Sequence, residues 1–211
     1  MDFVVDMESS LPSSVQKELL VVIGASTGGT EAIKEVLTRF PVGMPSILIV
    51  QHMPEMFTNS FAKRLDGLCK IHVKEAEDGE DIVPGVAYVA PGHSHLSVRQ
   101  GGLGLQCELL RTEPVNRHRP SVDVLFYSVA KCLGPRGIGV MLTGMGKDGA
   151  QGMLAMRQAG AYNICQDQNS SVVWGMPREA TMLGAAHETV ALCDVATRVM
   201  VRLRGSEKQG K

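Results

Sequence analysis

Three apolar segments, each running into a glycine or a polar turn, set the fold class of this chain. They read ELLVVIGA at 18–25, SILIVQH at 46–52 and GIGVMLTGM at 137–145. Runs without polar alternation are typical of parallel strands that helices cover on both faces. The stretches after the first and third runs, 30–40 and 148–160, space their apolar residues as helices do. The sequence therefore predicts a doubly wound α/β fold, with a mostly parallel sheet and flanking helices.

Other segments depart from this alternation of strand and helix. Residues 83–110 contain short alternating runs around Gly101 and Gly102, which predict an antiparallel hairpin at one edge of the sheet. Residues 1–18 are rich in serine and charge, so we expect a flexible tail or linker remnant there. The folded domain is expected over 19–203, followed by a polar tail over 204–211.

Composition narrows the class of protein. A chain of 211 residues with 44% hydrophobic content can bury one large core. The net charge of −1 gives no electrostatic footprint for nucleic acid or an anionic membrane, and no segment reaches the roughly 20 apolar residues that span a bilayer. The start is acidic, unlike a signal peptide, and the five cysteines contain no C-x-x-C pair. We expect a cytoplasmic protein without membrane insertion, disulfide framework or zinc cluster.

A glycine-rich turn after the first strand offers a candidate nucleophile. Residues 24–28 fit G-x-S-x-G, which lifts Ser26 clear of the sheet beside the amides of a helix start. A phosphate-binding loop would carry lysine after its last glycine, whereas Thr30 stands there, and a dinucleotide fingerprint would need glycine at position 26. From this stretch alone, a tight turn without a reactive role stays open as the alternative.

A base and an acid follow the other two strands. His52 comes directly after the second run and Asp148 follows the third, and parallel strands bring their carboxyl ends to one edge. An imidazole oriented by a carboxylate activates a serine for acyl transfer. The amides of Thr27 and of the turn 144–146 are placed to stabilise an oxyanion. Glycines on both sides of Asp148 predict an exposed loop with little packing.

The remaining polar clusters are less specific. His93 and His95 would share a strand face and could bind a metal, but no acidic or thiol partner stands at useful spacing. Arg117 and Arg119 precede the start of a predicted helix, where they would dock a carboxylate or form a solvated loop.

Nine ordered segments closely resemble the catalytic domain of CheB, the chemotaxis protein-glutamate methylesterase family, over about residues 19 to 203. They are IGASTGGTEAI, QHMP, FAKRLDGLC, VKEAEDGE, YVAPG, PVNRHRPSVDVLF, LTGMGKDGA, GMLAMRQAG and VWGMPREA. The resemblance implies that Ser26, His52 and Asp148 form a catalytic triad, supported by Thr27 and the Met145 amide. It implies hydrolysis of glutamyl methyl esters, and deamidation of glutamines, on methyl-accepting chemotaxis receptors, without cofactor or metal.

The chain also departs from the pattern it resembles. Family members usually carry an N-terminal phospho-receiver domain, and nothing before Leu19 is long enough to be one, so we expect an isolated effector domain. A separate regulatory chain could then restrain it. The order Ser, His, Asp differs from the Ser, Asp, His order of α/β-hydrolases. Two alternatives remain: a serine esterase or deamidase of the same fold acting on another modified protein, and a receptor-binding module without catalysis.

Overall fold

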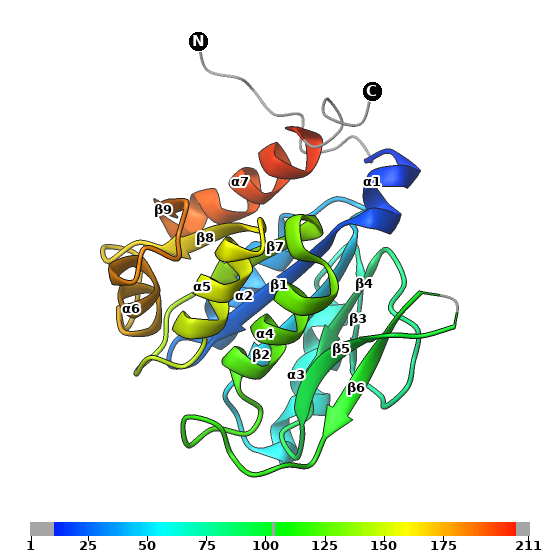
Figure 1. Cartoon of the computed structure of the whole chain (residues 1–211), viewed down its shortest axis with the longest axis horizontal. Coiled ribbons are helices and arrows are strands. Elements are labelled where there is room, and N and C mark those ends of the chain that lie inside the picture. Colours follow the sequence, from blue (N-terminus) through cyan, green and yellow to red (C-terminus); the bar gives the residue numbers. More distant parts are fainter. Residues whose placement is uncertain (1–10, 103, 206–211) are drawn as a thin grey trace.

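A seven-stranded parallel sheet forms the centre of this computed structural model, which describes residues 11–102 and 104–205 (Figure 1). Its strands lie in the order β3-β4-β2-β1-β7-β8-β9. Their bounds are β1 Leu20–Ala25, β2 Ser46–Gln51, β3 His72–Glu75, β4 Val86–Val89, β7 Gly137–Met141, β8 Tyr162–Gln166 and β9 Glu188–Val190. Each neighbouring pair is parallel, so the prediction of a doubly wound, mostly parallel α/β sheet is confirmed.

Helices cover both faces of this sheet. One face packs against α2 (Gly29–Thr38), α3 (Glu55–Asp66) and α7 (Leu192–Gly205). The other packs against α4 (Val122–Cys132), α5 (Ala150–Gln158) and α6 (Met176–Met182). A 3-10 turn, Gly134–Arg136, precedes β7. The three layers are visible in Figure 1.

Burial on both faces explains why the central strands lack polar alternation. All six residues of β1 and all six of β2 are buried. Along β1, Val21 and Ile23 belong to the core beneath α2, α3 and α7, whereas Leu20 and Val22 belong to the core beneath α4, α5 and α6. Both faces of these strands therefore remove apolar area from water, which is the main driving force for this arrangement.

The position of β1 determines where a site can form. Its neighbours are β2, the next strand in the chain, and β7, which the chain reaches only after a long excursion. The helices after β1 and β7, α2 and α5, consequently lie on opposite faces of the sheet. At such a switch point the turns beyond the strand ends diverge and leave a crevice.

The antiparallel hairpin is confirmed, with a smaller extent than predicted. Strands β5 (His95–Gln100) and β6 (Leu105–Leu110) form a separate two-stranded sheet. The start of the predicted excursion is different, because β4 joins the main sheet in parallel with β2 and β3. Ala87 and Val89 are buried there, so core packing overrides the hairpin-like pattern.

The segment before β1 is also more ordered than a tail. Residues 13–18 form α1 (Ser13–Glu18), and Leu11 and Val15 are buried against the sheet core. Leu11 precedes the helix and Val15 lies within it, and burial of these two side chains gives this short segment its contact with the core. At the other end α7 continues to Gly205. The rest of the predicted tails, 1–10 and 206–211, lies outside the described residues.

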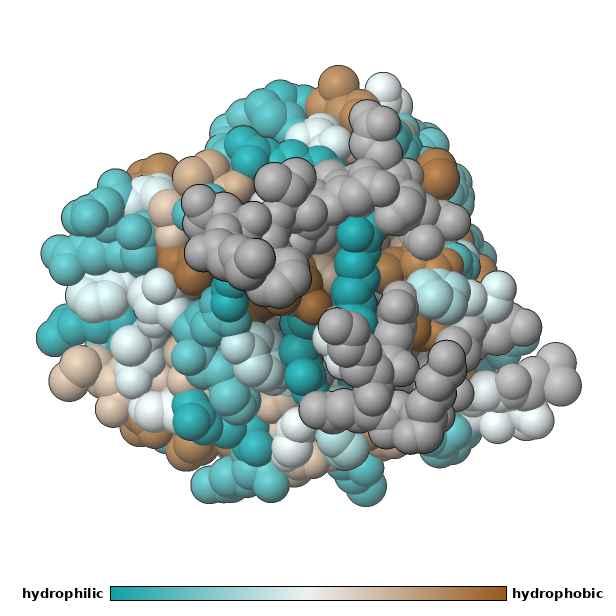
Figure 2. All heavy atoms as spheres, turned by 90° about the horizontal axis from the view of Figure 1, so that it is seen from above, coloured by the Kyte–Doolittle hydropathy of each residue, from teal (hydrophilic) through white to brown (hydrophobic). Residues whose placement is uncertain are grey.

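The outer surface of the layers is mixed in character. Figure 2 looks down on the side that carries α7 and α1, where hydrophilic side chains alternate with hydrophobic ones over the visible part. Within 11–102 and 104–205, none of the helices combines the length and the apolar character that crossing a membrane requires.

Gly149, at the start of α5, offers a test of how tightly the turns at the strand ends are packed. Its φ is 89°, and an added Cβ would lie 2.4 Å from Val122 Cγ1. Gly149→Ala should destabilise the protein by the left-handed backbone cost of about 1–2 kcal/mol and an overpacking cost of about 1–3 kcal/mol. Urea unfolding measures the sum.

Gly184 provides the matched control. Its φ is 69°, and a Cβ there would meet nothing within 4 Å. Gly184→Ala should therefore lose only the backbone cost. Equal losses in the two variants would mean that Val122 moves aside without penalty.

Candidate active site

Ser26 stands on the turn between β1 and α2. The turn is possible because Gly28 adopts a φ of 79°, and Val172 lies so close that a side chain at Gly28 would clash. The Ser26 amide donates to the Thr143 carbonyl at 3.0 Å, which ties this turn to the segment after β7. Ser26 itself is half-buried. Its side chain is thus held at the switch point and remains accessible.

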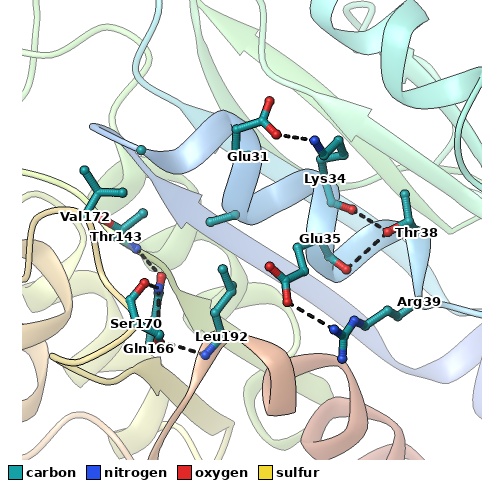
Figure 3. A pocket seen from close by; sticks show the side chains of 12 residues that line it. Glu31, Lys34, Glu35, Thr38, Arg39, Thr143, Gln166, Ser170, Val172 and Leu192 are labelled. Carbon is teal, nitrogen blue, oxygen red and sulfur yellow. Dashed lines mark hydrogen bonds and ion pairs between the residues drawn. The ribbon is translucent and has the colours of Figure 1, made fainter.

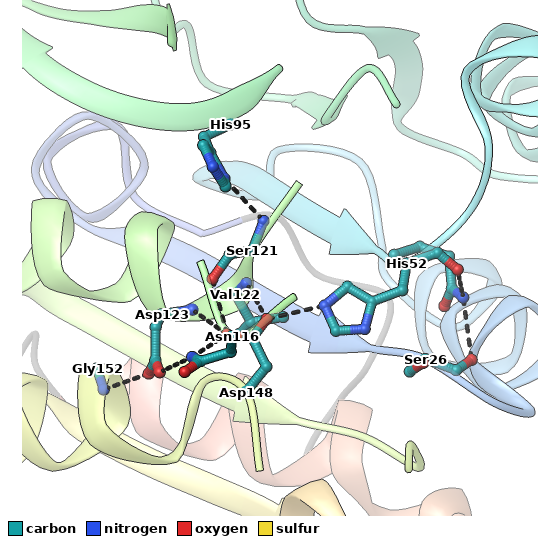
Figure 4. Close-up of polar contacts among 10 residues, drawn as sticks. Ser26, His52, His95, Asn116, Ser121, Val122, Asp123, Asp148 and Gly152 are labelled. Carbon is teal, nitrogen blue, oxygen red and sulfur yellow. Dashed lines mark hydrogen bonds and ion pairs between the residues drawn. The ribbon is translucent and has the colours of Figure 1, made fainter. Parts of the chain in front are cut away.

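His52 and Asp148 are paired. His52 Nε2 lies 2.8 Å from Asp148 Oδ2, and the two side chains are 8% and 1% exposed. An ionised carboxylate only accepts hydrogen bonds, so Nε2 carries the proton and Nδ1 presents a lone pair. Nδ1 is buried and has no hydrogen-bond partner among the described residues. In Figure 4, Ser26 lies on the side of the imidazole away from Asp148.

Asp148 is held by a set of donors that its flanking glycines do not indicate. Its carboxylate accepts hydrogen bonds from Asn116 Nδ2 at 2.8 Å, Ser121 Oγ at 2.7 Å and the Val122 amide at 2.7 Å. The last donor belongs to the start of α4, where the helix dipole also favours negative charge. The expectation of an exposed loop at Asp148 was wrong, because the start of α4 covers it.

These contacts determine the charge state of Asp148. Burial raises its pKa, but the hydrogen bonds from His52, Asn116, Ser121 and Val122 outweigh burial and lower the pKa from 3.8 to about 2. The group is therefore a carboxylate at neutral pH, able to stabilise a protonated His52.

Asn116 joins Asp148 to a second buried acid. The same Nδ2 group lies 2.6 Å from Asp123 Oδ2, and Asp123 Oδ1 accepts from the Gly152 amide at 2.6 Å. Burial raises the pKa of Asp123; the Gly152 amide opposes this shift and the nearby Asp148 adds to it. The two carboxylates thus have opposite shifts within one network.

A single tight turn contacts both members of the His52–Asp148 pair. Val115 and His118 exchange backbone hydrogen bonds at 3.1 and 2.9 Å, and Asn116 and Arg117 between them have φ values of 53° and 67°. The His118 ring stacks on His52, with centroids 3.8 Å apart and planes inclined by 7°. Burial lowers the pKa of His118, and His52 adds to this effect. A neutral ring therefore covers His52.

A cavity of about 670 Å³ opens beside Ser26 and Asp148. Its lining consists of Ser26, Thr27, Asn116, Arg117, His118, Met145, Gly146, Lys147 and Asp148. A second cavity of about 320 Å³ is also lined by Arg117 and His118 and extends to His52, Arg119 and Pro120. The structure thus brings most of the predicted site residues to one hollow.

The two predicted docking arginines are not equivalent. Arg117 lines both cavities and holds a left-handed conformation that costs a bulky residue about 1–2 kcal/mol. Arg119 lines only the smaller cavity, and its Nη1 donates to the Thr112 carbonyl at 3.0 Å. Arg117 is consequently the better placed of the two to meet a ligand in the larger cavity.

Two backbone amides near Ser26 are free to bind an oxyanion. Among the described residues, neither the Thr27 nor the Met145 amide has a hydrogen-bond acceptor. The Thr143 hydroxyl donates to the Thr27 carbonyl at 3.0 Å, which joins the two turns that carry these amides. The Gly144 carbonyl accepts from the Met176 amide at 2.8 Å, which fixes the second turn.

His93 and His95, the two histidines considered as metal ligands, form hydrogen bonds within the protein instead. His95 is fully buried; its Nδ1 accepts from the Ser121 amide at 3.0 Å and its Nε2 donates to the Glu113 carbonyl at 3.1 Å. His93 Nδ1 pairs with Ser94 Oγ at 2.6 Å. In the part of the chain that the structure describes, no cluster of three His, Cys, Asp or Glu residues is arranged to hold a metal ion.

A further cavity of about 400 Å³ lies beside α2 (Figure 3), and Gly28 and Thr143 from the turns around Ser26 are among its lining residues. Its charged lining groups pair with one another: Lys34 with Glu31, and Arg39 with Glu35 at 3.1 Å. None of the predicted site residues lines it.

Comparison with known proteins identifies the family. The CheB methylesterase family model matches residues 21–199. The chain belongs to the CheB methylesterase family. The protein-glutamate methylesterase/protein-glutamine glutaminase of Nitrosomonas europaea is 62% identical over 195 residues, which is 92% of this chain and 54% of that protein. A similarly named protein of Cupriavidus pinatubonensis is 59% identical over 88% of this chain and 52% of its own length.

A solved structure supports the same assignment. The catalytic domain of Thermotoga maritima CheB methylesterase matches with a TM-score of 0.84 and 36% identity, over 86% of this chain and 97% of that domain. The chain therefore has the fold of a CheB catalytic domain. It spans about half the length of the curated relatives it matches.

Sequence reasoning missed three residues of this site: Asn116, His118 and Ser121. Asn116 and His118 flank Arg117, which was considered only for its charge. The sequence contains one signal for these residues: a run of polar residues precedes the apolar start of α4. The start of a helix favours contact with a carboxylate, so polar residues there could have been expected around Asp148.

The lowered pKa of Asp148 predicts a specific pH dependence of stability. A carboxylate whose folded pKa lies below its unfolded value stabilises the fold above about pH 4, here by about 2 kcal/mol, and this contribution is lost as the pH falls toward 2. Asp148→Asn should therefore be less stable than the wild type at pH 7. The difference should shrink below pH 4 in urea unfolding.

Asp123→Asn is the matched control, because Asp123 is buried in the same network with a raised pKa. Ionised Asp123 costs stability at neutral pH, so protonation relieves the wild type and not the variant. The stability of the wild type relative to this variant should rise as the pH falls. The same trend in both variants would contradict the opposite pKa shifts.

Proposed function

We propose that this chain hydrolyses glutamyl methyl esters, and deamidates glutamines, on methyl-accepting chemotaxis receptors. The names of the two relatives support the reaction, although they describe proteins about twice as long as this chain. The observation that carries the proposal is the arrangement of three groups. His52 Nε2 is bonded to Asp148, and His52 Nδ1 has no partner among the described residues. Ser26 lies on the side of the imidazole away from Asp148 and lines the larger cavity (Figure 4). We place the reaction in the cytoplasm, on the cytoplasmic domains of these receptors.

In the first step of the proposed reaction, Ser26 Oγ attacks the ester carbonyl carbon while His52 Nδ1 takes the hydroxyl proton. A serine hydroxyl is a weak nucleophile until a neighbouring base removes this proton. The carboxylate of Asp148 stabilises the imidazolium that forms, and the lowered pKa of Asp148 keeps this charge in place. Asp148 itself stays ionised throughout.

The tetrahedral intermediate places negative charge on the former carbonyl oxygen. The Thr27 and Met145 amides would donate to it, since neither has another acceptor among the described residues. Preorganised donors of this kind lower the barrier because they need no reorientation during the reaction.

Collapse of the intermediate breaks the bond to the leaving group. His52 returns its proton to methoxide, which leaves as methanol, and the glutamyl group remains esterified to Ser26. A water molecule deprotonated by His52 then releases the glutamate and restores the serine. With a glutamine substrate the leaving group is ammonia and the acyl-enzyme is the same.

Ser26→Ala tests the nucleophile. Methanol release from a methylated receptor fragment should fall to background, while circular dichroism stays unchanged because the side chain is half-buried and its Cβ is retained. A fluorophosphonate should label the wild type and an exposed-serine control, Ser60→Ala, but not Ser26→Ala. More than a few per cent residual turnover would exclude this nucleophile. Labelling without methyl-ester turnover would favour another esterase function. The absence of both labelling and turnover would favour a binding module.

The two arginines should differ in receptor use. Arg117→Ala should lower kcat/KM for a receptor fragment by about fivefold, the effect of a surface ion pair worth about 1 kcal/mol, and Arg119→Ala by less. Neither should alter hydrolysis of a small activated ester. The effect of Arg117→Ala should shrink with added salt, because exposed charges are screened. Equal losses on both substrates at every ionic strength would place Arg117 in the fold instead of in docking.

A further inference from the structure

Gln51 contacts the backbone of both the proposed nucleophile and the proposed base. It is the last residue of β2 and is 4% exposed. Its Nε2 group lies 2.9 Å from the Ser26 carbonyl oxygen and 3.1 Å from the His52 carbonyl oxygen. One side-chain amide therefore joins the ends of two neighbouring strands at the point where their catalytic residues emerge.

This contact lies where the backbone ladder of the sheet stops. The register of β1 and β2 ends with the pair Ala25 and Gln51, and the His52 amide makes the last backbone link, to the Ala25 carbonyl at 3.1 Å. The backbone of Ser26 bonds elsewhere, to Thr143 and to Gly29. Within the described residues, the Gln51 amide is the hydrogen bond that connects Ser26 with β2.

The surroundings fix which way the amide faces. Carbonyl oxygens only accept hydrogen bonds, so the nitrogen of Gln51 must face Ser26 and His52. The oxygen packs against the start of α2, where a Cβ on Gly29 would lie 2.1 Å from Gln51 Oε1. The side chain is thus confined between the two strand ends and the helix.

We propose that Gln51 is a positioning residue that sets the separation of Ser26 and His52. This inference rests on the proposed function, because it concerns the proton transfer between these two residues. Such a transfer requires the two heavy atoms to come within hydrogen-bond distance. Gln51 does not line the substrate cavity, so it acts on kcat and leaves substrate binding unchanged.

Gln51→Met tests this role, since methionine has a similar length and flexibility without the two donors. We expect kcat for methanol release to fall about 10- to 100-fold, the scale of a displacement of about 1 Å between reacting groups. KM should stay near the wild-type value. The rate of fluorophosphonate labelling at Ser26 should fall with kcat, and this readout needs no receptor.

Asn163 offers a matched control. It is fully buried in β8, and its Nδ2 donates to the carbonyls of Met153 at 2.7 Å and Ala185 at 3.0 Å. The bonding pattern is the same as that of Gln51, but neither acceptor belongs to the site. Asn163→Leu should lower the urea midpoint and leave kcat and the labelling rate of the folded protein unchanged.

The outcomes separate this inference from the proposed function. If the wild type hydrolyses the methyl ester and Gln51→Met has the same kcat, only the role of Gln51 is overturned. An equal loss of kcat in Gln51→Met and Asn163→Leu would overturn it as well. If the wild type releases no methanol but labels at Ser26, the labelling rates of the wild type and the two variants decide the role of Gln51. If it does neither, the proposed function and this inference fail together.

Gln51→Glu provides a second test that holds even if the methionine variant does not fold. An ionised carboxylate cannot donate to the two carbonyls and is repelled by them, whereas a protonated carboxyl can donate to one. The kcat of this variant relative to that of the wild type should therefore rise as the pH falls. A merely structural role would shift the unfolding midpoint without this trend, so a ratio that is flat with pH would overturn the proposal.

Discussion

Parallel pairing of β1 with β2 on one side and β7 on the other is the constraint on which the site depends. The register places the ends of these three strands at one edge, and α2 and α5 leave that edge toward opposite faces. Ser26, His52 and Asp148 are separated in the chain; Ser26 and His52 directly follow β1 and β2, and Asp148 lies in the loop between β7 and α5. Burial of apolar side chains on both faces holds the strands, so the same force that folds the domain brings the three groups together.

A second layer of contacts refines what the sheet supplies. Asp148 is a buried charge, and a buried charge is tolerated only when donors surround it. The start of α4 provides the Val122 amide and Ser121, and the neighbouring turn provides Asn116. The acid therefore fastens α4 and that turn to the end of β7. Its charge serves the fold and the proposed chemistry at once.

Local sequence patterns predict those parts of the structure that depend on residues close together in the chain. The central strands were predicted because burial on both faces leaves continuous apolar runs. Ser26, His52 and Asp148 were singled out as candidates because each follows such a run or its turn. The strand β4 and the helix α1 were not, since both are short and owe their place to packing on residues distant in sequence.

Local sequence patterns also fail to predict the surroundings of Asp148. Glycines 146 and 149 are local signals of a turn, and they say nothing about which distant helix covers it. Asn116 and His118 reach the site only because the β5–β6 hairpin precedes them and α4 follows. Periodicity carries no information about contacts between residues this far apart in the chain. The sequence therefore indicates candidate reactive groups before it indicates the residues that would orient them.

The turn at Val115 to His118 has a consequence for how this protein can vary. Surface loops usually accept insertions and deletions, and residues 111–117 are exposed. Here, however, Asn116 bonds to Asp148 while His118, two residues later, stacks on His52. One residue added or removed between Asn116 and His118 would detach one of these contacts. The spacing within this turn is therefore fixed as strictly as that of a core strand, although the exposed side chains before it are free to diverge.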